Sequence, residues 1–251
     1  MLKAIAFDLW ETLITNNPEV SIGHGQYRIE RLERVLMGHG HAAEAAEIER
    51  AYRNVWHRCQ ELYWSADIDI PCRRQIEVFV EELGVDPAKI DDETFEEMER
   101  VYANAAVDLL PDVVPGAREL LGAVRERGLR TGLISNTGRT PGYALREILD
   151  RLELSPYIDA MVFSNEHGAC KPQPSIFEQL RSALGVRYDE MLFIGDNLYV
   201  DVYGAKRCGM TAVHFQPPVR GTAVAPAVEV EVEADATVSD LRDLLTVLRE
   251  S

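Results

Sequence analysis

Asp8 is the residue whose type and position most directly suggest chemistry. It ends a short apolar run near the N-terminus, Ala-Ile-Ala-Phe at residues 4–7. An apolar run that stops at one acid is typical of a strand buried on both faces, and in open α/β sheets ligands bind just beyond the carboxyl ends of such strands. An acid in this place is also a common strand terminator or helix cap. The rest of the chain has to decide between these two interpretations.

Three later segments place polar side chains in the same way. Ser135 and Asp196 each follow a short apolar run, and Lys171 lies in the loop after another. Singly, each has an ordinary explanation as a helix cap, a turn former or a solvated loop charge. A parallel sheet would nevertheless gather these three side chains and Asp8 along one edge. The sequence therefore predicts a polar site at that edge.

The residue types at this predicted site suit phosphoryl transfer. The Asp8 carboxylate can act as a nucleophile that forms a covalent intermediate. A second acid, Asp196, would repel it unless a cation lay between them, and magnesium is a hard ion that takes oxygen ligands of this kind. Asp201, one helical turn later, could join or orient these ligands. Lys171 would supply a fixed positive charge to the phosphoryl group, and the Ser135 hydroxyl would hold its oxygens.

The elements that must position these residues alternate between strand and helix from about residue 115 onward. Short apolar runs bounded by Gly and polar residues alternate with amphipathic stretches, which predicts an α/β fold with a doubly wound parallel sheet. Alternation with period two predicts a half-exposed edge strand over residues 228–232, before a final helix over residues 239–249. The other predicted strands after the first cover residues 129–134, 158–163, 191–194 and 211–215.

The stretch from residue 16 to residue 107 has a different character. It is rich in Glu, Arg and Ala, and apolar residues recur at three-and-four spacing, as in Ile48, Tyr52 and Val55. Such spacing is typical of amphipathic helices. Clusters of Gly and Pro divide the stretch into several helices, so we predict a small helical bundle inserted after the first strand.

Composition limits the kinds of partner. The chain has 251 residues, of which 46% are hydrophobic, enough to bury a full core. Its formal net charge of −16 disfavours a surface that must hold a polyanion, so we expect no nucleic acid and no membrane as partner. The four cysteines lack CxxC pairing and no leader precedes the first strand, so we expect a reduced, cytoplasmic protein without a zinc cluster.

Four segments resemble, in order and spacing, the motifs of the haloacid dehalogenase-like (HAD) superfamily. The segments are FDLWETL from residue 7, GLISNTG from residue 132, ACKPQPSIF from residue 169 and FIGDNLYVDVYGAKRCGM from residue 193. The resemblance covers nearly the whole chain. It implies a Rossmann-like core formed by residues 1–15 and 108–251, with a helical cap domain at residues 16–107.

The same resemblance implies roles for individual residues. The implied catalytic residues are Asp8 as nucleophile, Ser135 as phosphate-binding hydroxyl and Lys171 as stabilising lysine. The implied ligands of Mg²⁺ are Asp8, the acidic pair Asp196 and Asp201, and the backbone carbonyl of Trp10. The candidate substrate-binding residues are Trp10, Thr12, Asn136, Thr137 and, in the predicted cap, Arg28.

One position departs from the first motif. Phosphatases of the superfamily usually carry a second Asp two residues after the nucleophile, which protonates the leaving oxygen and then activates water; this chain has Trp10 there. Glu11 follows, where the superfamily usually has Gly, and its side chain is expected to point elsewhere. Loss of a general acid and base lowers the reaction rate on the order of 10²–10⁴-fold. A replacement donor could come from His24 or His57 in the predicted cap.

Trp10 leaves other reactions open. A 2-haloacid dehalogenase needs no such acid, because halide leaves unprotonated, but the dehalogenases resembling this chain have neutral residues where it has Asp196. A phosphonatase needs a lysine in the cap, and Lys89 is the one lysine in the predicted cap. A third possibility is a non-catalytic homologue that binds a phosphorylated ligand or a protein.

Taken together, these features predict a magnesium-dependent phosphohydrolase. It would act on a small phosphorylated metabolite through an aspartyl phosphate on Asp8, as a monomer or a homodimer. Cap arginines could contact the anionic groups of the substrate, although an Arg that is displayed to solvent is commoner. The candidates are Arg28, Arg31, Arg73 and Arg74.

Overall fold

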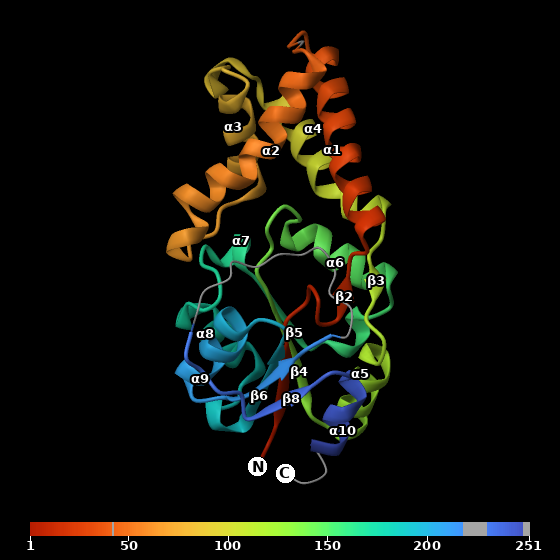
Figure 1. Cartoon of the computed structure of the whole chain (residues 1–251), viewed down its shortest axis with the longest axis vertical. Helices are drawn as coiled ribbons and strands as arrows, with labels where there is room; N and C mark the ends of the chain where they lie inside the picture. The colour runs from red at the N-terminus through yellow and green to blue at the C-terminus, as the bar shows by residue number, and fades with distance from the viewer. Residues whose placement is uncertain (42, 218–229, 248–251) are drawn as a thin grey trace.

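The computed structural model describes residues 1–41, 43–217 and 230–247. Figure 1 shows a sheet with helices around it, and above the sheet a group of helices built from the first half of the chain. The strands are β1 (Ala4–Phe7), β2 (Ile14–Thr15), β3 (Asp112–Val113), β4 (Arg130–Ser135), β5 (Ala160–Phe163), β6 (Met191–Gly195), β7 (Thr211–Phe215) and β8 (Ala236–Val238).

The helices follow the predicted alternation with the strands. The α-helices are α1 (Pro18–Gly38), α2 (Ala45–Leu62), α3 (Cys72–Glu82), α4 (Asp92–Asp108), α5 (Ala117–Glu126), α6 (Gly142–Arg151), α7 (Ser164–His167), α8 (Pro174–Leu184), α9 (Gly204–Cys208) and α10 (Leu244–Val247). The 3-10 helices are η1 (Trp64–Ala66), η2 (Pro87–Lys89), η3 (Ser155–Tyr157), η4 (Tyr188–Glu190) and η6 (Leu241–Asp243), and η5 (Leu198–Tyr203) is a π-helix.

The main sheet is parallel and doubly wound, as predicted. Its strand order is β5-β4-β1-β6-β7-β8, and every neighbouring pair runs parallel. β1 lies between β4 and β6, with Phe7 level with Leu133 on one side and Ile194 on the other. The order of the strands reverses here, and such a switch point opens a crevice beyond the carboxyl ends of the strands. Asp8 is the first residue beyond β1 at this crevice.

Side-chain size along β1 matches the two layers of helices. Ile5 and Phe7 join the hydrophobic cluster that includes residues of α5 and α6, whereas Ala4 and Ala6 join the cluster that includes residues of α8 and α9. Alternation with period two sends successive side chains to opposite faces. On the side of α8 the fit is close, because a Cβ at Gly132 of β4 would lie 2.8 Å from a methyl carbon of Leu180. Both faces of the sheet are therefore buried.

Helices α1–α4 enclose a separate hydrophobic cluster, which includes Ile48, Val55, Phe79 and Met98. Figure 1 shows these helices above the sheet. The chain leaves the sheet region and returns to it through β2 and β3, which pair antiparallel. The predicted helical bundle after the first strand is thus present in the structure.

The C-terminal region differs from its prediction. Residues 230–232, part of the predicted edge strand 228–232, form no strand, and the edge strand is β8 instead. The start of β8 is fixed by Asp235, whose carboxylate accepts from the backbone N–H of Ala212 on β7, a contact that alternation alone does not reveal. The predicted final helix 239–249 is a 3-10 turn, η6, followed by α10. Residues 228, 229, 248 and 249 lie outside the described residues.

None of the helices in residues 1–41, 43–217 and 230–247 combines the length and the apolar character that a bilayer crossing requires.

We predict that Leu145→Ala lowers the free energy of unfolding by about 2–5 kcal/mol. Leu145 lies on α6 with no exposed surface, in the cluster that packs against β1. The matched control is Leu62→Ala on α2, where the side chain is 44% exposed, with an expected loss of about 0.5 kcal/mol or less. Urea unfolding of both variants measures the difference. Equal losses would contradict this account of the core.

Candidate active site

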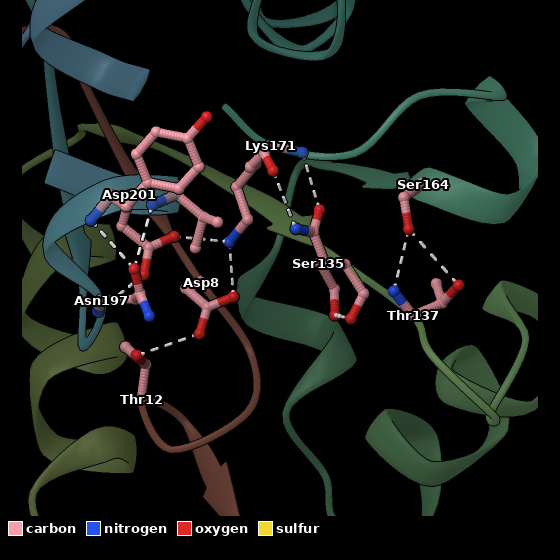
Figure 2. A network of polar contacts seen from close by, with 11 residues as sticks. Asp8, Thr12, Ser135, Thr137, Ser164, Lys171, Asn197 and Asp201 are labelled. Atoms are coloured by element: carbon pink, nitrogen blue, oxygen red, sulfur yellow. Dashed lines mark hydrogen bonds and ion pairs between the residues drawn. The ribbon is translucent and has the colours of Figure 1, made fainter. Parts of the chain in front are cut away.

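A buried lysine lies between two buried carboxylates at the carboxyl ends of the strands. Lys171 Nζ is 2.6 Å from Asp8 Oδ1 and 2.6 Å from Asp201 Oδ1. The Lys171 and Asp201 side chains are each 1% exposed, and that of Asp8 is 10% exposed. Figure 2 shows the three side chains converging, with the Thr12 hydroxyl donating to Asp8 Oδ2 at 3.2 Å. The predicted site therefore brings Asp8, Lys171, Asp201 and Thr12 together.

The backbone of Lys171 is held by the end of β4. The Asn136 side chain donates through Nδ2 to the Lys171 carbonyl at 3.1 Å and accepts from the Lys171 N–H at 2.8 Å. This pair of hydrogen bonds ties the Lys171 loop to the residue that follows Ser135. Asn136 was predicted to bind substrate, and in this structure its side chain is engaged with the Lys171 backbone.

Asp201 is positioned by the turn that follows β6. The N–H of Asn197 donates to Asp201 Oδ2 at 3.0 Å, and Asp201 lies in the π-helix η5. Gly195 ends β6 directly beneath this carboxylate, and a methyl group on Gly195 would overlap it. Both oxygens of Asp201 are thus engaged, one with Asn197 and the other with Lys171.

Burial and neighbouring charges set the protonation of the site. Burial raises the pKa of the Asp8 carboxyl from 3.8 to about 6, against the lowering effect of Lys171, and the Asp201 carboxylate adds to the rise. Burial works to lower the pKa of Lys171, but the Asp201 and Asp8 carboxylates outweigh it, so the net shift is upward. Lys171 is therefore a cation, and the site carries more negative than positive charge.

Asp196 adds a third carboxylate to this group. Asp8, Asp196 and Asp201 each offer an oxygen, and these oxygens lie within 4.8 Å of one another. Asp196 directly follows β6 and is half-buried. Three carboxylates against one lysine leave a charge imbalance that a divalent cation would relieve, and oxygen donors are those that Mg²⁺ prefers. The residues present therefore fit a magnesium ion.

Two predicted site residues lie apart from this cluster of acids. The Thr137 hydroxyl donates to Asp69 Oδ2 at 3.0 Å, and the Thr137 N–H donates to Ser164 Oγ at 2.8 Å. Figure 2 shows Thr137 and Ser164 separated from Asp8 by Ser135. Arg28 is buried in the cap, where it donates to the Tyr102 carbonyl at 2.8 Å.

Two further predicted site residues are Ser135, at the end of β4, and Trp10, two residues after Asp8. Ser135 ends β4 with no exposed surface, and its hydroxyl lies 3.4 Å from the carbonyl of Asn136. Trp10 is half-buried, forms an isolated bridge with Ile14 and packs against the core. Glu11 beside it has φ of 61°, a left-handed conformation that Gly adopts readily, and the Thr15 hydroxyl donates to its Oε2 at 2.9 Å.

The candidate histidines, lysine and arginines of the helical bundle are engaged elsewhere or exposed. His24 Nε2 lies 2.6 Å from the Leu109 carbonyl, which can only accept, and burial lowers the pKa of His24, so the ring is a neutral donor there. His57, Lys89 and Arg31 are exposed. Arg73 and Arg74 form ion pairs with acids of the cap, Asp92, Glu77, Glu81 and Glu99.

Asp69 and Ser164 are polar residues of this region that the sequence did not single out. Asp69 precedes α3 in a loop of the cap, and Ser164 follows β5, yet both contact Thr137. Their separation of 95 residues along the chain leaves no local pattern that links them. The signals that could have pointed to them are weak: Asp69 lies two residues before a Pro, and Ser164 follows a strand.

The fold is that of an α/β protein with a parallel sheet and an inserted helical bundle, and its strand ends hold a cluster of acids with a buried lysine. A family model for haloacid dehalogenase-like hydrolases matches residues 2–209. The chain therefore belongs to the haloacid dehalogenase-like hydrolases.

The chain is also similar in sequence to proteins named as phosphatases. The chain is 37% identical over 147 residues to a glyceraldehyde 3-phosphate phosphatase of Pyrococcus furiosus, a match over 59% of this chain and 58% of that protein. It is 29% identical over 260 residues to a protein of the same name from Methanopyrus kandleri, over 100% of this chain and 98% of the relative. The match to the Pyrococcus protein thus spans less than two thirds of that protein's length.

A solved structure agrees in fold. The crystal structure of a 2-haloacid dehalogenase from Pseudomonas syringae pv. Tomato DC3000 matches with a TM-score of 0.70 and 20% identity, over 100% of this chain and 99% of that chain. At this level of identity the likeness shows a common fold and leaves the reaction open.

We predict that Gly195→Ala lowers the free energy of unfolding by about 1–3 kcal/mol, because the added methyl must displace the Asp201 carboxylate or the backbone. The control is Gly122→Ala on α5, where a Cβ would meet nothing within 4 Å. That variant is expected to gain up to about 1 kcal/mol from helix propensity. Denaturant unfolding compares the two. A Gly195→Ala protein as stable as Gly122→Ala would refute the close packing of Asp201 on β6.

Proposed function

We propose that this chain is a magnesium-dependent phosphatase that hydrolyses a small phosphorylated metabolite through an aspartyl phosphate on Asp8. The observation that carries the proposal is the buried contact of Lys171 with Asp8 beside two further carboxylates. A nucleophile, a fixed cation and an excess of acids at one strand edge are the parts that phosphoryl transfer needs. The phosphatase names of the Pyrococcus and Methanopyrus relatives support the same reaction class.

The metal would be held by Asp8, Asp196 and the backbone carbonyl of Trp10. Asp201 would orient this shell rather than bind the ion directly, because its two oxygens are engaged with Lys171 and Asn197. The ion would neutralise the carboxylates and the charge that develops on the phosphoryl oxygens.

The proposed reaction has two chemical steps, and Asp8, Lys171 and Ser135 act in the first of them. In the first, an oxygen of Asp8 attacks phosphorus, the bond from phosphorus to the ester oxygen breaks, and the alkoxide or aryloxide leaves with the bonding electron pair and takes a proton from water. Lys171 and the Ser135 hydroxyl would hold the phosphoryl oxygens as charge develops on them. In the second, water attacks the phosphorus of the aspartyl phosphate and the bond from phosphorus to the Asp8 oxygen breaks, which restores the Asp8 carboxylate and releases inorganic phosphate carrying the protons of the water.

A dehalogenase is the second candidate, and Trp10 is the observation that favours it. Halide departs without a proton, so Trp10 in the place of an acid is compatible with carbon–halogen cleavage. Asp196 argues for the phosphatase, because its half-buried carboxylate has a use as a metal ligand and none in metal-free dehalogenation. A non-catalytic protein that binds a phosphorylated ligand would have the same arrangement of side chains without turnover.

We also propose that residues 16–107 act as a cap domain on a core of residues 1–15 and 108–251. The proposal is supported by the separate hydrophobic cluster of α1–α4 and by the narrow connection through β2 and β3. A cap in this place would exclude water from the aspartyl phosphate and contact the variable part of the substrate.

We expect Asp8→Asn to lower the hydrolysis of p-nitrophenyl phosphate in Mg²⁺ by roughly 10⁴-fold or more, since an amide cannot replace the carboxylate nucleophile. Asp243→Asn, which changes an exposed acid on η6, is the matched control and is expected to keep wild-type turnover. Calorimetric titration with Mg²⁺ forms the second measurement, in which Asp196→Asn loses the binding heat and Asp243→Asn retains it. Wild-type turnover by Asp8→Asn would exclude the covalent mechanism.

Because position 10 holds Trp and no acid, we expect turnover to depend on the leaving group of the substrate. The leaving oxygen must depart largely as an anion, so turnover is expected to fall steeply as the leaving alcohol becomes less acidic. Trp10→Asp should flatten that dependence and raise alkyl phosphate turnover by up to roughly 10²–10⁴-fold. Rates on a series of aryl and alkyl phosphates measure both slopes, and urea unfolding separates any loss of stability from removal of the indole. Similar wild-type rates on aryl and alkyl esters would show that another residue already donates the proton.

A further inference from the structure

The loop that follows β4 is held by cap side chains at three positions, 137, 138 and 140. Thr137 donates to Asp69, and the carbonyl of Gly138 accepts from Gln75 Nε2 at 2.7 Å. Arg28 Nη2 lies 3.3 Å from the Thr140 hydroxyl, which accepts from it. Asp69, Gln75 and Arg28 come from three separate parts of the cap. The cap therefore fixes residues 137–140, which we call the β4 loop.

Arg139 of the same loop makes the reciprocal contact, since here the loop supplies the side chain and the cap supplies its partners. Its guanidinium carbon lies 4.2 Å from the centre of the Tyr52 ring. Its Nη1 donates to the Tyr102 hydroxyl at 2.9 Å, and its Nη2 donates to the Tyr52 carbonyl at 3.2 Å. A cation over an aromatic ring with two hydrogen bonds is a specific contact, so the loop and the cap have a defined relative placement.

Asp69 divides its two carboxylate oxygens between the cap and the core. Oδ1 accepts from Trp64 Nε1 at 2.9 Å and from the Ile70 N–H at 2.8 Å, both in the cap. Oδ2 accepts from the hydroxyls of Thr137 and Ser164, both in the core. Asp69 is 4% exposed. A buried carboxylate is stable when its lone pairs are satisfied, so Asp69 is held here only while cap and core are in contact.

A short chain of contacts leads from Asp69 to the catalytic lysine. Asp69 holds Thr137, and the neighbouring Asn136 forms the two hydrogen bonds to the backbone of Lys171. Lys171 in turn contacts Asp8. Displacement of Thr137 would therefore move the residue that fixes Lys171.

We propose that Asp69 is a positioning residue that couples the docking of the cap to the conformation of the β4 loop, and through Asn136 to the placement of Lys171. Its effect on catalysis rests on the proposed phosphatase function, whereas its effect on the loop does not. An Asn at position 69 offers an acceptor oxygen on one side and an NH₂ donor on the other, so one set of hydrogen bonds must reverse or be lost, and the negative charge that strengthens both sets is removed.

The test compares Asp69→Asn with Asp67→Asn in the full-length protein. Asp67 lies two residues earlier in the same cap loop, and its φ of 55° is a conformation that Asn tolerates. Two quantities are measured in each variant: amide hydrogen exchange at Thr137, whose N–H donates to Ser164, and kcat and KM for p-nitrophenyl phosphate in Mg²⁺.

We expect Asp69→Asn to speed exchange at Thr137 and to lower kcat about 10–100-fold with a much smaller change in KM, the size typical of groups that orient catalytic residues. Asp67→Asn should match the wild type in both. If Asp69→Asn does not fold, Thr137→Val, which keeps the shape and lacks the hydroxyl, should show the same two changes.

Equal exchange at Thr137 in the Asp69→Asn and Asp67→Asn proteins would overturn the coupling. Faster exchange with unchanged kcat would overturn the positioning role. A wild-type protein without any phosphatase activity would refute the proposed function, and the exchange comparison would still decide whether Asp69 orders the β4 loop.

Discussion

The contact of Lys171 with Asp8 and Asp201 is the interaction on which the arrangement of the core depends. Charged groups lose much of their hydration on burial, and a buried charge is stable only with close partners of opposite sign. The three side chains come from a loop, the end of β1 and a π-helix, and their contact requires β1 to lie between β4 and β6. The bare backbone of Gly195 leaves space for Asp201. The contact therefore depends both on the order of the strands and on the absence of a side chain at Gly195.

The acids around this contact outnumber the lysine and destabilise one another. Lys171 can balance one carboxylate, yet three acids lie within reach of one another, and burial raises the pKa of Asp8 to about 6. Active sites commonly hold ionisable groups in environments that destabilise their charged forms, and a bound substrate or metal can offset that destabilisation. An excess of negative charge of this kind is typical of a binding site, whereas a structural ion pair has balanced charges. The helical bundle α1–α4 and the segments between its helices contact the β4 loop, in part through Asp69.

Sequence reasoning reached the sheet and the residues at its strand ends because both follow from periodic patterns. Ile5 and Phe7 alternate with Ala4 and Ala6, and each polar residue directly follows a strand or lies in the next loop, so the parallel topology was enough to bring Asp8, Lys171 and Asp201 together. The contacts of the cap with the core have no such pattern. Asp69 and Thr137 are 68 residues apart, and their pairing depends on the docking of helices whose sequence shows only which face is apolar. The left-handed turn at Glu11 was also hidden, because Glu gives no sign of positive φ.

The central claim is that Asp8 becomes phosphorylated during turnover. The most direct measurement is mass spectrometry of the peptide that contains Asp8, after rapid acid quench of the protein mixed with an aryl phosphate and Mg²⁺. The account predicts one added phosphoryl group on that peptide in the wild type, absent from Asp8→Asn. Turnover of the ester with no phosphoryl group on Asp8 at any quench time, or with the group on another residue, would contradict it.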